Sequence, residues 1–217
     1  SNNQITRRVR GTAGGDRVFV DYPVSTNTAP MMGVNCLFHA TVSEDAFFGT
    51  LDLTDFYLGS PMPSPEFLII HTALFSDQLL DDLNITPYVQ KDKAGKSFFY
   101  ARVDKTMPGF RQAGLHAHEH VTSLLLKHGY YQTQPCMFTH NVDPIFFALV
   151  VDDYGVKYTD RTHFDRLVAC LSQKYHVKAH PVASSFLGMT LHHDRTARTF
   201  TTSMPNYIPN LLARHRP

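Results

Sequence analysis

The sequence contains no long apolar run. None of its 217 residues lies in a stretch of about 18 apolar residues, so no membrane-spanning helix is predicted. The first residues, from Ser1 to Gln4, are polar and no apolar signal segment follows, so secretion is not expected. Cysteine is scarce, and Cys36, Cys136 and Cys170 form no Cys-X-X-Cys pair. This pattern excludes a paired-cysteine zinc site and favours a reducing, intracellular compartment.

An excess of one charge is also absent. Twenty Lys and Arg residues against 19 Asp and Glu residues leave a formal net charge of +1, so composition alone predicts no nucleic-acid partner. Arginines do gather near both ends of the chain. These clusters either contact phosphates or form a solvated face, and charge alone favours the solvated face. They comprise Arg7, Arg8, Arg10 and Arg17 at the start, and Arg195, Arg198, Arg214 and Arg216 at the end.

Short β-prone segments alternate with helical patterns, without an internal repeat or a linker. The predicted strands are 4–10, 17–20, 47–53, 67–70, 89–91, 97–103, 145–151, 155–158, 184–192 and 199–202. The predicted helices are 29–42, capped from 25–27, then 77–83, 112–127, 162–175 and a last helix opened by Pro205. Because strands and helices are intermixed and many strands are joined by hairpins, the sequence predicts an α+β fold around an antiparallel sheet.

Two of the predicted strands carry carboxylates at their ends, next to apolar residues. One contains Leu51-Asp52-Leu53 and the other ends in Val151-Asp152-Asp153. Carboxylates on buried strands are costly unless something neutralises them. Mg²⁺ binds a few carboxylates together with water and substrate phosphates, and two such ions would hold both oxygens of an in-line phosphoryl transfer. The alternative for the Asp pair is a simple β-turn, but its apolar and aromatic flanks favour the metal site.

Further motifs accompany these two strand ends. Asp52-Leu-Thr-Asp-Phe-Tyr57 is similar to the first polymerase motif of reverse transcriptases, and Val151-Asp152-Asp153 to their YxDD hairpin, with Val150 in place of the Tyr. Four more segments are similar to the YGLKQAP segment, the FLG primer-grip hairpin, the start of the thumb connection and the KARLVA finger strand. They are Met107-Pro-Gly-Phe-Arg-Gln112-Ala-Gly114, Ser185-Phe-Leu-Gly188-Met-Thr, Asn206-Tyr207-Ile-Pro-Asn-Leu-Leu212 and Arg7-Arg8-Val9-Arg10. Over nearly its whole length the chain therefore resembles copia-type retrotransposon reverse transcriptases.

The resemblance implies a polymerase palm, with an antiparallel sheet and helices on one face, joined to partial fingers. Its divisions would be partial fingers at 1–46, palm with the first catalytic motif at 47–66, a fingers hairpin at 67–106, palm again at 107–195 and the start of the thumb connection at 196–217. The implied activity is RNA-directed DNA polymerisation by two-metal nucleotidyl transfer. The implied cofactor is a pair of Mg²⁺ ions, with Mn²⁺ as the alternative.

The resemblance also implies roles for the carboxylates. Asp52 and Asp152 would be the principal metal ligands, assisted by the backbone carbonyl of Leu53, and Asp153 would be a secondary carboxylate. Because side chains alternate along a strand, we expect Asp152 to share the face of Asp52 and Asp153 to leave on the other face.

Other residues match positions around the substrates of the family. Tyr57 would be the steric gate under the sugar, with core packing as its alternative, and Gln112 would pack beside the incoming nucleotide. Arg8 would contact the triphosphate. Leu187 and Gly188 would belong to the primer grip. Lys178 is the candidate for protonating the leaving pyrophosphate, with His180 as a substitute and a solvated lysine as the alternative.

The implied partners are dNTP and a primed RNA or DNA template, without a membrane. The chain would act as an oligomer or within a larger polyprotein, in a cytoplasmic particle or the nucleus. Two other functions remain open. One is an inactive retroelement remnant whose palm binds nucleic acid without turnover, and the other is a different palm-type nucleotidyltransferase, such as a cyclase.

Overall fold

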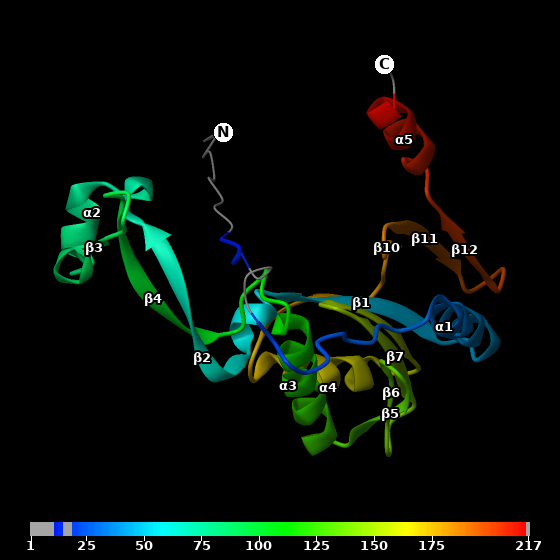
Figure 1. Cartoon of the computed structure of the whole chain (residues 1–217). Coiled ribbons are helices and arrows are strands. Elements are labelled where there is room, and N and C mark those ends of the chain that lie inside the picture. The colour runs from blue at the N-terminus through cyan, green and yellow to red at the C-terminus, as the bar shows by residue number, and fades with distance from the viewer. Residues whose placement is uncertain (1–10, 15–18, 216–217) are drawn as a thin grey trace, which may run out of the picture. The chain divides into compact units, whose positions relative to one another are not determined.

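The structure, a computed structural model, describes residues 11–14 and 19–215 (Figure 1). They form two compact units, one of residues 11–14, 19–24 and 57–117 and the other of residues 25–56 and 118–215. The finger-strand motif with Arg8 lies outside the described residues, as does most of the hairpin expected around Gly14 and Gly15.

The larger unit is built on a six-stranded antiparallel sheet. Its strand order is β5-β6-β7-β8-β1-β9. The strands are β5 (Tyr130–Gln134), β6 (Met137–His140), β7 (Ile145–Val150), β8 (Asp153–Tyr158), β1 (Phe47–Thr54) and β9 (His176–His180). Strands β5 to β8 follow one another as hairpins, whereas β1 comes from earlier in the chain and lies between β8 and β9. This insertion brings segments that are far apart in the sequence to neighbouring strands.

One face of this sheet is covered by helix α4 (Arg161–Ser172). Asp160 caps the helix by accepting the backbone N–H of Thr162, and one side of the helix is buried, comprising Phe164, Leu167, Cys170 and Leu171. Phe164 packs against Tyr158 of β8, with ring centroids 5.0 Å apart. It also lies over Gly49 of β1, where an added Cβ would sit 2.7 Å from the ring. Close packing on this face therefore depends on a residue without a side chain in β1.

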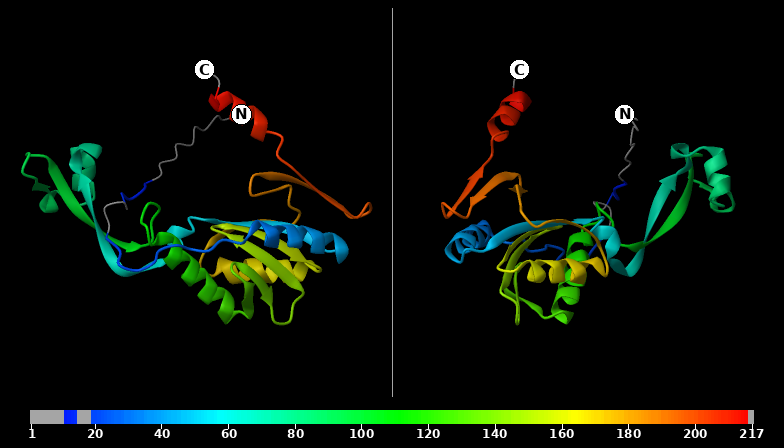
Figure 2. Two further views of the ribbon diagram at one scale, coloured as in Figure 1. Left: turned by 45° about the vertical axis from the view of Figure 1, so that its right-hand side comes forward. Right: turned by 180° about the vertical axis from the view of Figure 1, so that it is seen from behind.

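The opposite face carries helix α1 (Met31–Ser43) and a second, three-stranded sheet. That sheet contains β10 (Ser185–Phe186), β11 (Met189–Asp194) and β12 (Thr199–Ser203) in this order. Figure 2 shows α4 and this sheet on opposite sides of the six-stranded sheet. Phe38 of α1 contacts Phe48 of β1 and stacks on Phe200 of β12. One aromatic cluster therefore joins α1, the six-stranded sheet and the three-stranded sheet. A final helix, α5 (Tyr207–His215), has no buried residue.

The smaller unit contains a three-stranded antiparallel sheet of order β2-β4-β3. Its strands are β2 (Pro61–His71), β4 (Ser97–Lys105) and β3 (Gln90–Lys91), and helix α2 (Asp77–Asp82) follows β2 after a short 3-10 turn. Phe99 and Leu80 are buried in this unit, whereas Phe67, Ile69 and Tyr100 are exposed. Helix α3 (Ala113–Lys127) begins in this unit, and the boundary between the units falls within it.

The predicted α+β class with antiparallel sheets is confirmed, with α1 as an addition on the second face. Three details of the prediction are wrong. Helix α1 begins at Met31 after Pro30, without a side-chain cap, so residues 25–27 do not cap it. The last helix begins at Tyr207 rather than at Pro205. The segment expected as one strand at 184–192 is folded into two strands, because its turn falls at Leu187 and Gly188. In the described part of the chain, no helix has the length and apolar character needed to cross a membrane.

Candidate active site

Three ionisable side chains lie side by side across neighbouring strands of the six-stranded sheet. Asp52 of β1 is paired with Asp153 of β8 on one side and with Lys178 of β9 on the other. Directly opposed residues of antiparallel strands place their side chains on the same face. The Lys178 Nζ donates a hydrogen bond to the Asp52 Oδ2 at 3.0 Å. We call this row of Lys178, Asp52 and Asp153 the charged rung.

The hairpin between β7 and β8 brings Asp152 and Asp153 to the charged rung. Val150 pairs with Asp153, so Val151 and Asp152 form a two-residue turn. The backbone N–H of Leu53 donates to the carbonyl oxygen of Asp152 at 3.1 Å, which ties the turn to β1. Asp153, rather than Asp152, is thus the residue directly opposite Asp52. The expected register is wrong by one residue, because strand alternation stops at Val150.

Val151 has an unusual backbone conformation at the tip of this hairpin. Its φ angle is +59°, and its side chain is exposed. β-Branched residues rarely adopt positive φ, and two-residue hairpin turns usually place Gly, Asn or Asp at such positions. Strained residues of this kind persist where the surrounding structure enforces them, and they cluster at functional sites. Here the β7–β8 ladder and the Leu53–Asp152 hydrogen bond hold the strained residue next to the carboxylates.

The electrostatics of the charged rung favour binding of a cation. Burial raises the pKa of Asp153, and the neighbouring charges of Asp152 and Asp52 raise the pKa further. Among the described residues, no three His, Cys, Asp or Glu side chains form a metal-binding cluster by themselves. Two carboxylates on one face, with a third in the adjacent turn, instead match the open type of Mg²⁺ site, which is completed by water and substrate oxygens. The residues present therefore fit the expected ions.

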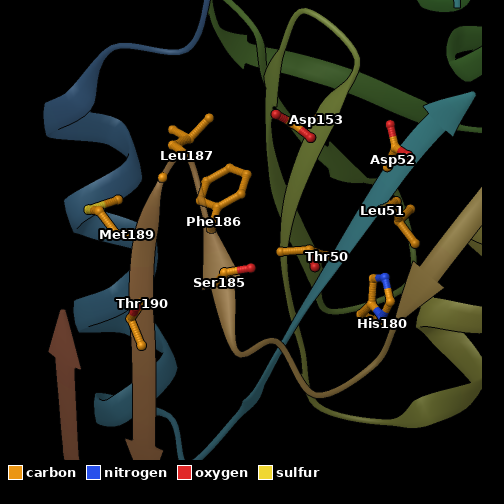
Figure 3. Close-up of a pocket in the computed structure, with 11 residues that line it drawn as sticks. Thr50, Leu51, Asp52, Asp153, His180, Ser185, Phe186, Leu187, Met189 and Thr190 are labelled. Carbon is orange, nitrogen blue, oxygen red and sulfur yellow. The ribbon is translucent and has the colours of Figure 1, made fainter. Parts of the chain in front are cut away.

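A hollow of about 430 Å³ lies beside the two carboxylates of the rung. Figure 3 shows Asp52 and Asp153 on adjacent strands, with Phe186 and Leu187 of the β10–β11 hairpin facing them. The hollow is lined by Thr50, Leu51, Asp52, Asp153 and His180 from the sheet and by Ser185, Phe186, Leu187, Gly188, Met189 and Thr190 from the hairpin. The structure therefore brings the expected primer-grip residues, Leu187 and Gly188, next to the expected metal ligands.

The β10–β11 hairpin depends on two glycines for different reasons. Leu187 and Gly188 form its two-residue turn with φ angles of +50° and +77°, and an added Cβ at Gly188 would meet no atom within 4 Å. Gly188 is thus favoured by its backbone conformation rather than by space. Gly155 of β8 is required for space, because a Cβ there would lie 2.6 Å from the ring of Phe186 and 3.1 Å from that of Phe48.

Two further predicted residues come from the other compact unit. Tyr57 and Gln112 belong to the smaller unit. The backbone carbonyl of Tyr57 accepts a hydrogen bond from the Thr106 hydroxyl. Gln112 is 2% exposed and donates from Nε2 to Glu66 at 3.2 Å, while its Oε1 has no hydrogen-bond partner among the described residues. Thr50 also lines the hollow and was not predicted as a site residue. Strand alternation could have identified it, because it lies two positions from Asp52 and therefore on the same face.

The comparisons with known proteins indicate a distant retroelement relationship. No protein-family model matches the chain. The Retrovirus-related Pol polyprotein from transposon TNT 1-94 of Nicotiana tabacum is 25% identical over 154 residues, which cover 69% of this chain. The chain spans only 12% of the length of that polyprotein. It is thus distantly similar to part of a retrotransposon polyprotein.

Solved structures with a partial likeness are telomerases. Apo telomerase from Candida tropicalis aligns with a TM-score of 0.46 at 10% identity, covering 82% of this chain and 37% of the telomerase chain. Telomerase from Candida albicans in complex with a fragment of telomeric RNA aligns with a TM-score of 0.41 at 12% identity, covering 79% and 34% of the two chains. A likeness at this level carries no inference about function.

The repulsion in the charged rung predicts a pH-dependent effect on stability. Because the pKa of Asp153 is raised in the folded state, its ionisation destabilises the fold as pH rises above the ordinary value of 3.8. Asp153→Asn should therefore raise the thermal unfolding midpoint at neutral pH in the presence of a chelator, and the gain should vanish at acidic pH. Scans from about pH 3 to about pH 8 measure this, with the exposed Asp55→Asn as control. A lower unfolding midpoint for Asp153→Asn than for the wild type at neutral pH would contradict the inferred repulsion between Asp153 and its neighbouring carboxylates.

The contact between Gly155 and Phe186 predicts a second effect. Gly155→Ala should lower the free energy of unfolding by about 1–3 kcal/mol, because the added methyl group overpacks against two rings. When Phe186→Ala is also present, Gly155→Ala should cost much less, because the ring that it overpacks is gone. The free energies of unfolding of the single and double variants, measured in denaturant, should therefore be strongly non-additive. Additive effects would show that Gly155 does not provide the space for Phe186.

Proposed function

We propose that this chain is the polymerase core of a retrotransposon polyprotein and that it catalyses RNA-directed DNA synthesis by two-metal nucleotidyl transfer. The observation that supports this best is the charged rung. Asp52 and Asp153, far apart in the sequence, are paired on adjacent strands beside a hollow that also contains the Leu187–Gly188 turn. The distant similarity to the tobacco polyprotein supports the retroelement origin.

The residues of the rung would act by positioning and charge. Asp52, Asp152 and Asp153 would hold two Mg²⁺ or Mn²⁺ ions, which supply Lewis acidity at the α-phosphate of the nucleotide. The N–H and C=O of a strand residue point to the same edge, so the Leu53 carbonyl is directed toward the Asp152 turn and is available as a further oxygen donor. Lys178 would move from Asp52 to the leaving pyrophosphate and give it a proton. Preorganised charge of this kind is the main source of catalysis in phosphoryl transfer.

The substrates would be dNTP and a primer on an RNA or DNA template. Leu187 and Gly188 would contact the primer end. Tyr57 would lie under the sugar, Gln112 beside the incoming base and Arg8 against the triphosphate. An intracellular location fits the three cysteines, all of which are free thiols. The chain would act as an oligomer or within a larger polyprotein, and the match to only 12% of the tobacco polyprotein fits the second of these.

One contact favours a second candidate, a palm that binds nucleic acid without turnover. The ammonium group of Lys178 already neutralises part of the charge of Asp52 without any metal. A remnant of this kind would keep template binding and would not respond to Mg²⁺.

Primer extension on a homopolymer RNA template tests the proposal. With Mg²⁺ present, we expect extension by the wild-type chain and its loss by about 100-fold or more in Asp52→Asn, Asp152→Asn and Asp153→Asn, because each removes a charge at the ions. Asp55→Asn is the matched control, since Asp55 lies near the rung in sequence but is exposed. The second candidate would be favoured if the wild-type chain bound template without extending the primer, and if none of the three substitutions changed the binding.

Nucleotide selection gives a separate prediction. Tyr57→Ala should weaken discrimination against ribonucleotides by about tenfold or more, because the ring would no longer meet the 2′-hydroxyl. Tyr57→Phe should leave discrimination unchanged, since it keeps the ring. The measurement is the ratio of kcat/KM for dNTP and NTP. Equal ratios in the alanine variant and the wild type would assign Tyr57 to core packing.

A further inference from the structure

The loop between β11 and β12 is attached by Arg195 to Asp45 and to Phe47 at the start of β1, in the six-stranded sheet. The Arg195 Nε donates to the Asp45 Oδ1 at 3.0 Å, and its Nη2 donates to the Asp45 Oδ2 at 2.8 Å and to the Asp45 carbonyl at 2.9 Å. The guanidinium also lies over the ring of Phe47, 4.2 Å from its centroid. A forked, bidentate contact of this type fixes orientation as well as distance. We call this contact the hairpin latch.

Other contacts support the latch from the same short segments. Arg198 donates from Nη2 to the Ser43 carbonyl at 3.2 Å, at the end of α1. Asp194 closes the hairpin loop by accepting the backbone N–H of Ala197 at 2.9 Å. The hydrogen bond from Arg195 is the main cause of a lowered pKa at Asp45, as expected for a carboxylate that accepts hydrogen bonds from a guanidinium. The latch therefore joins the hairpin loop to the turn between α1 and β1.

The latch lies at or just outside the far ends of two strands, β1 and β11, that also reach the candidate active site. Strand β1 carries Phe47 at its start and Asp52 near its end, and β11 runs from the hollow at Met189 to the hairpin loop at Asp194. Besides a backbone hydrogen bond from the Ala183 N–H to the Phe48 carbonyl oxygen at 3.0 Å, the three-stranded sheet contacts β1 through aromatic rings, with Phe186 of β10 and Phe200 of β12 packed on Phe48. Such apolar contacts are less directional than a guanidinium fork. At the far end of the hairpin, the latch is thus a directional side-chain contact that can set the angle between the hairpin and β1.

We propose that Arg195 is a positioning residue for the primer end, acting through Asp45 and Phe47. By fixing β11 relative to β1, it sets where the Leu187–Gly188 turn faces Asp52 and Asp153. This inference rests on the proposed polymerase function. The ordinary alternative is a surface ion pair, because the Arg195 and Asp45 side chains are 40% and 63% exposed, and such pairs contribute little to stability.

Four variants separate the two readings. Arg195→Ala and Asp45→Asn break the fork, Arg195→Lys keeps the charge without the fork, and the exchange Arg195→Asp with Asp45→Arg restores an ion pair. The matched control is Arg161→Ala, because Arg161 also pairs with an exposed Asp165, at 2.8 Å, and lies over an aromatic ring, that of Phe164. Arg161 is on α4, on the face away from the hairpin.

The first readout is steady-state primer extension. Arg195→Ala and Asp45→Asn should raise the KM for primed template by about tenfold with the KM for dNTP unchanged, because only the primer end is displaced. Arg195→Lys should fall between these variants and the wild type, and the exchange should recover part of the loss. Equal KM values for primed template in the wild type, Arg195→Ala and Arg161→Ala would overturn the positioning role.

The second readout does not need catalysis. Backbone hydrogen exchange across β11 and β12 should be faster in Arg195→Ala than in Arg161→Ala, at similar thermal midpoints. The preference for a duplex with a recessed 3′ end over a blunt duplex, measured by fluorescence anisotropy, should fall in the same variant. If the wild type extends no primer, the proposed function fails while these two measurements still decide the latch. Unchanged exchange or unchanged end preference would overturn the inference.

Discussion

Two carboxylates paired on adjacent strands repel each other, and the arrangement of the larger unit can be understood from what holds them there. Asp52 and Asp153 are brought together by a ladder that runs the full length of β8, from the Phe47–Tyr158 pair to the Asp52–Asp153 pair. Helix α4 covers one face of these strands, and α1 and the β10–β12 sheet occupy the other. The repulsion is thus opposed by ladder hydrogen bonds and by buried apolar surface on both sides of the sheet.

Small residues occupy the positions where other layers come close to the two faces of the six-stranded sheet. Gly155 allows the ring of Phe186 to approach β8, and Gly49 allows Phe164 to approach β1 from the other side. The hairpin that carries Leu187 is therefore seated by the same strand, β8, that carries Asp153. A single strand thus relates the Leu187–Gly188 turn to the carboxylates, and a side chain at Gly155 would move one with respect to the other.

Much of this arrangement could be predicted from local patterns. The strands at 47–53 and 145–151, the helix at 162–175 and the pairing of 89–91 with 97–103 follow from apolar periodicity and turn residues, and the structure contains them to within a few residues. The register at the Asp pair could not be predicted in this way. The predicted register assumed that β7 continues through Val151. In the structure Val151 instead lies in the turn, with a positive φ that a β-branched residue rarely adopts.

Strand β9 shows a second limit of the sequence. His176–His180 has no strong apolar pattern, since four of its five residues are exposed, and its place at the sheet edge comes from pairing with β1. For this reason the neighbour of Lys178 could not be identified from spacing, although the lysine itself was a candidate. The partial burial of Asp52 beside a lysine on the edge strand is a property of the tertiary fold.

The charge balance of the site follows from this edge position. Three carboxylates, Asp52, Asp152 and Asp153, gather at one end of the sheet, and Lys178 supplies the ammonium group bonded to Asp52. One ammonium leaves an excess of negative charge among these side chains. Burial, together with the charges of both neighbouring carboxylates, raises the pKa of the half-buried Asp153. A divalent cation would offset this excess more fully than a lysine. On the proposed function, cation binding would release Lys178 from Asp52, so that binding of the ions and freeing of the proton donor would be coupled steps.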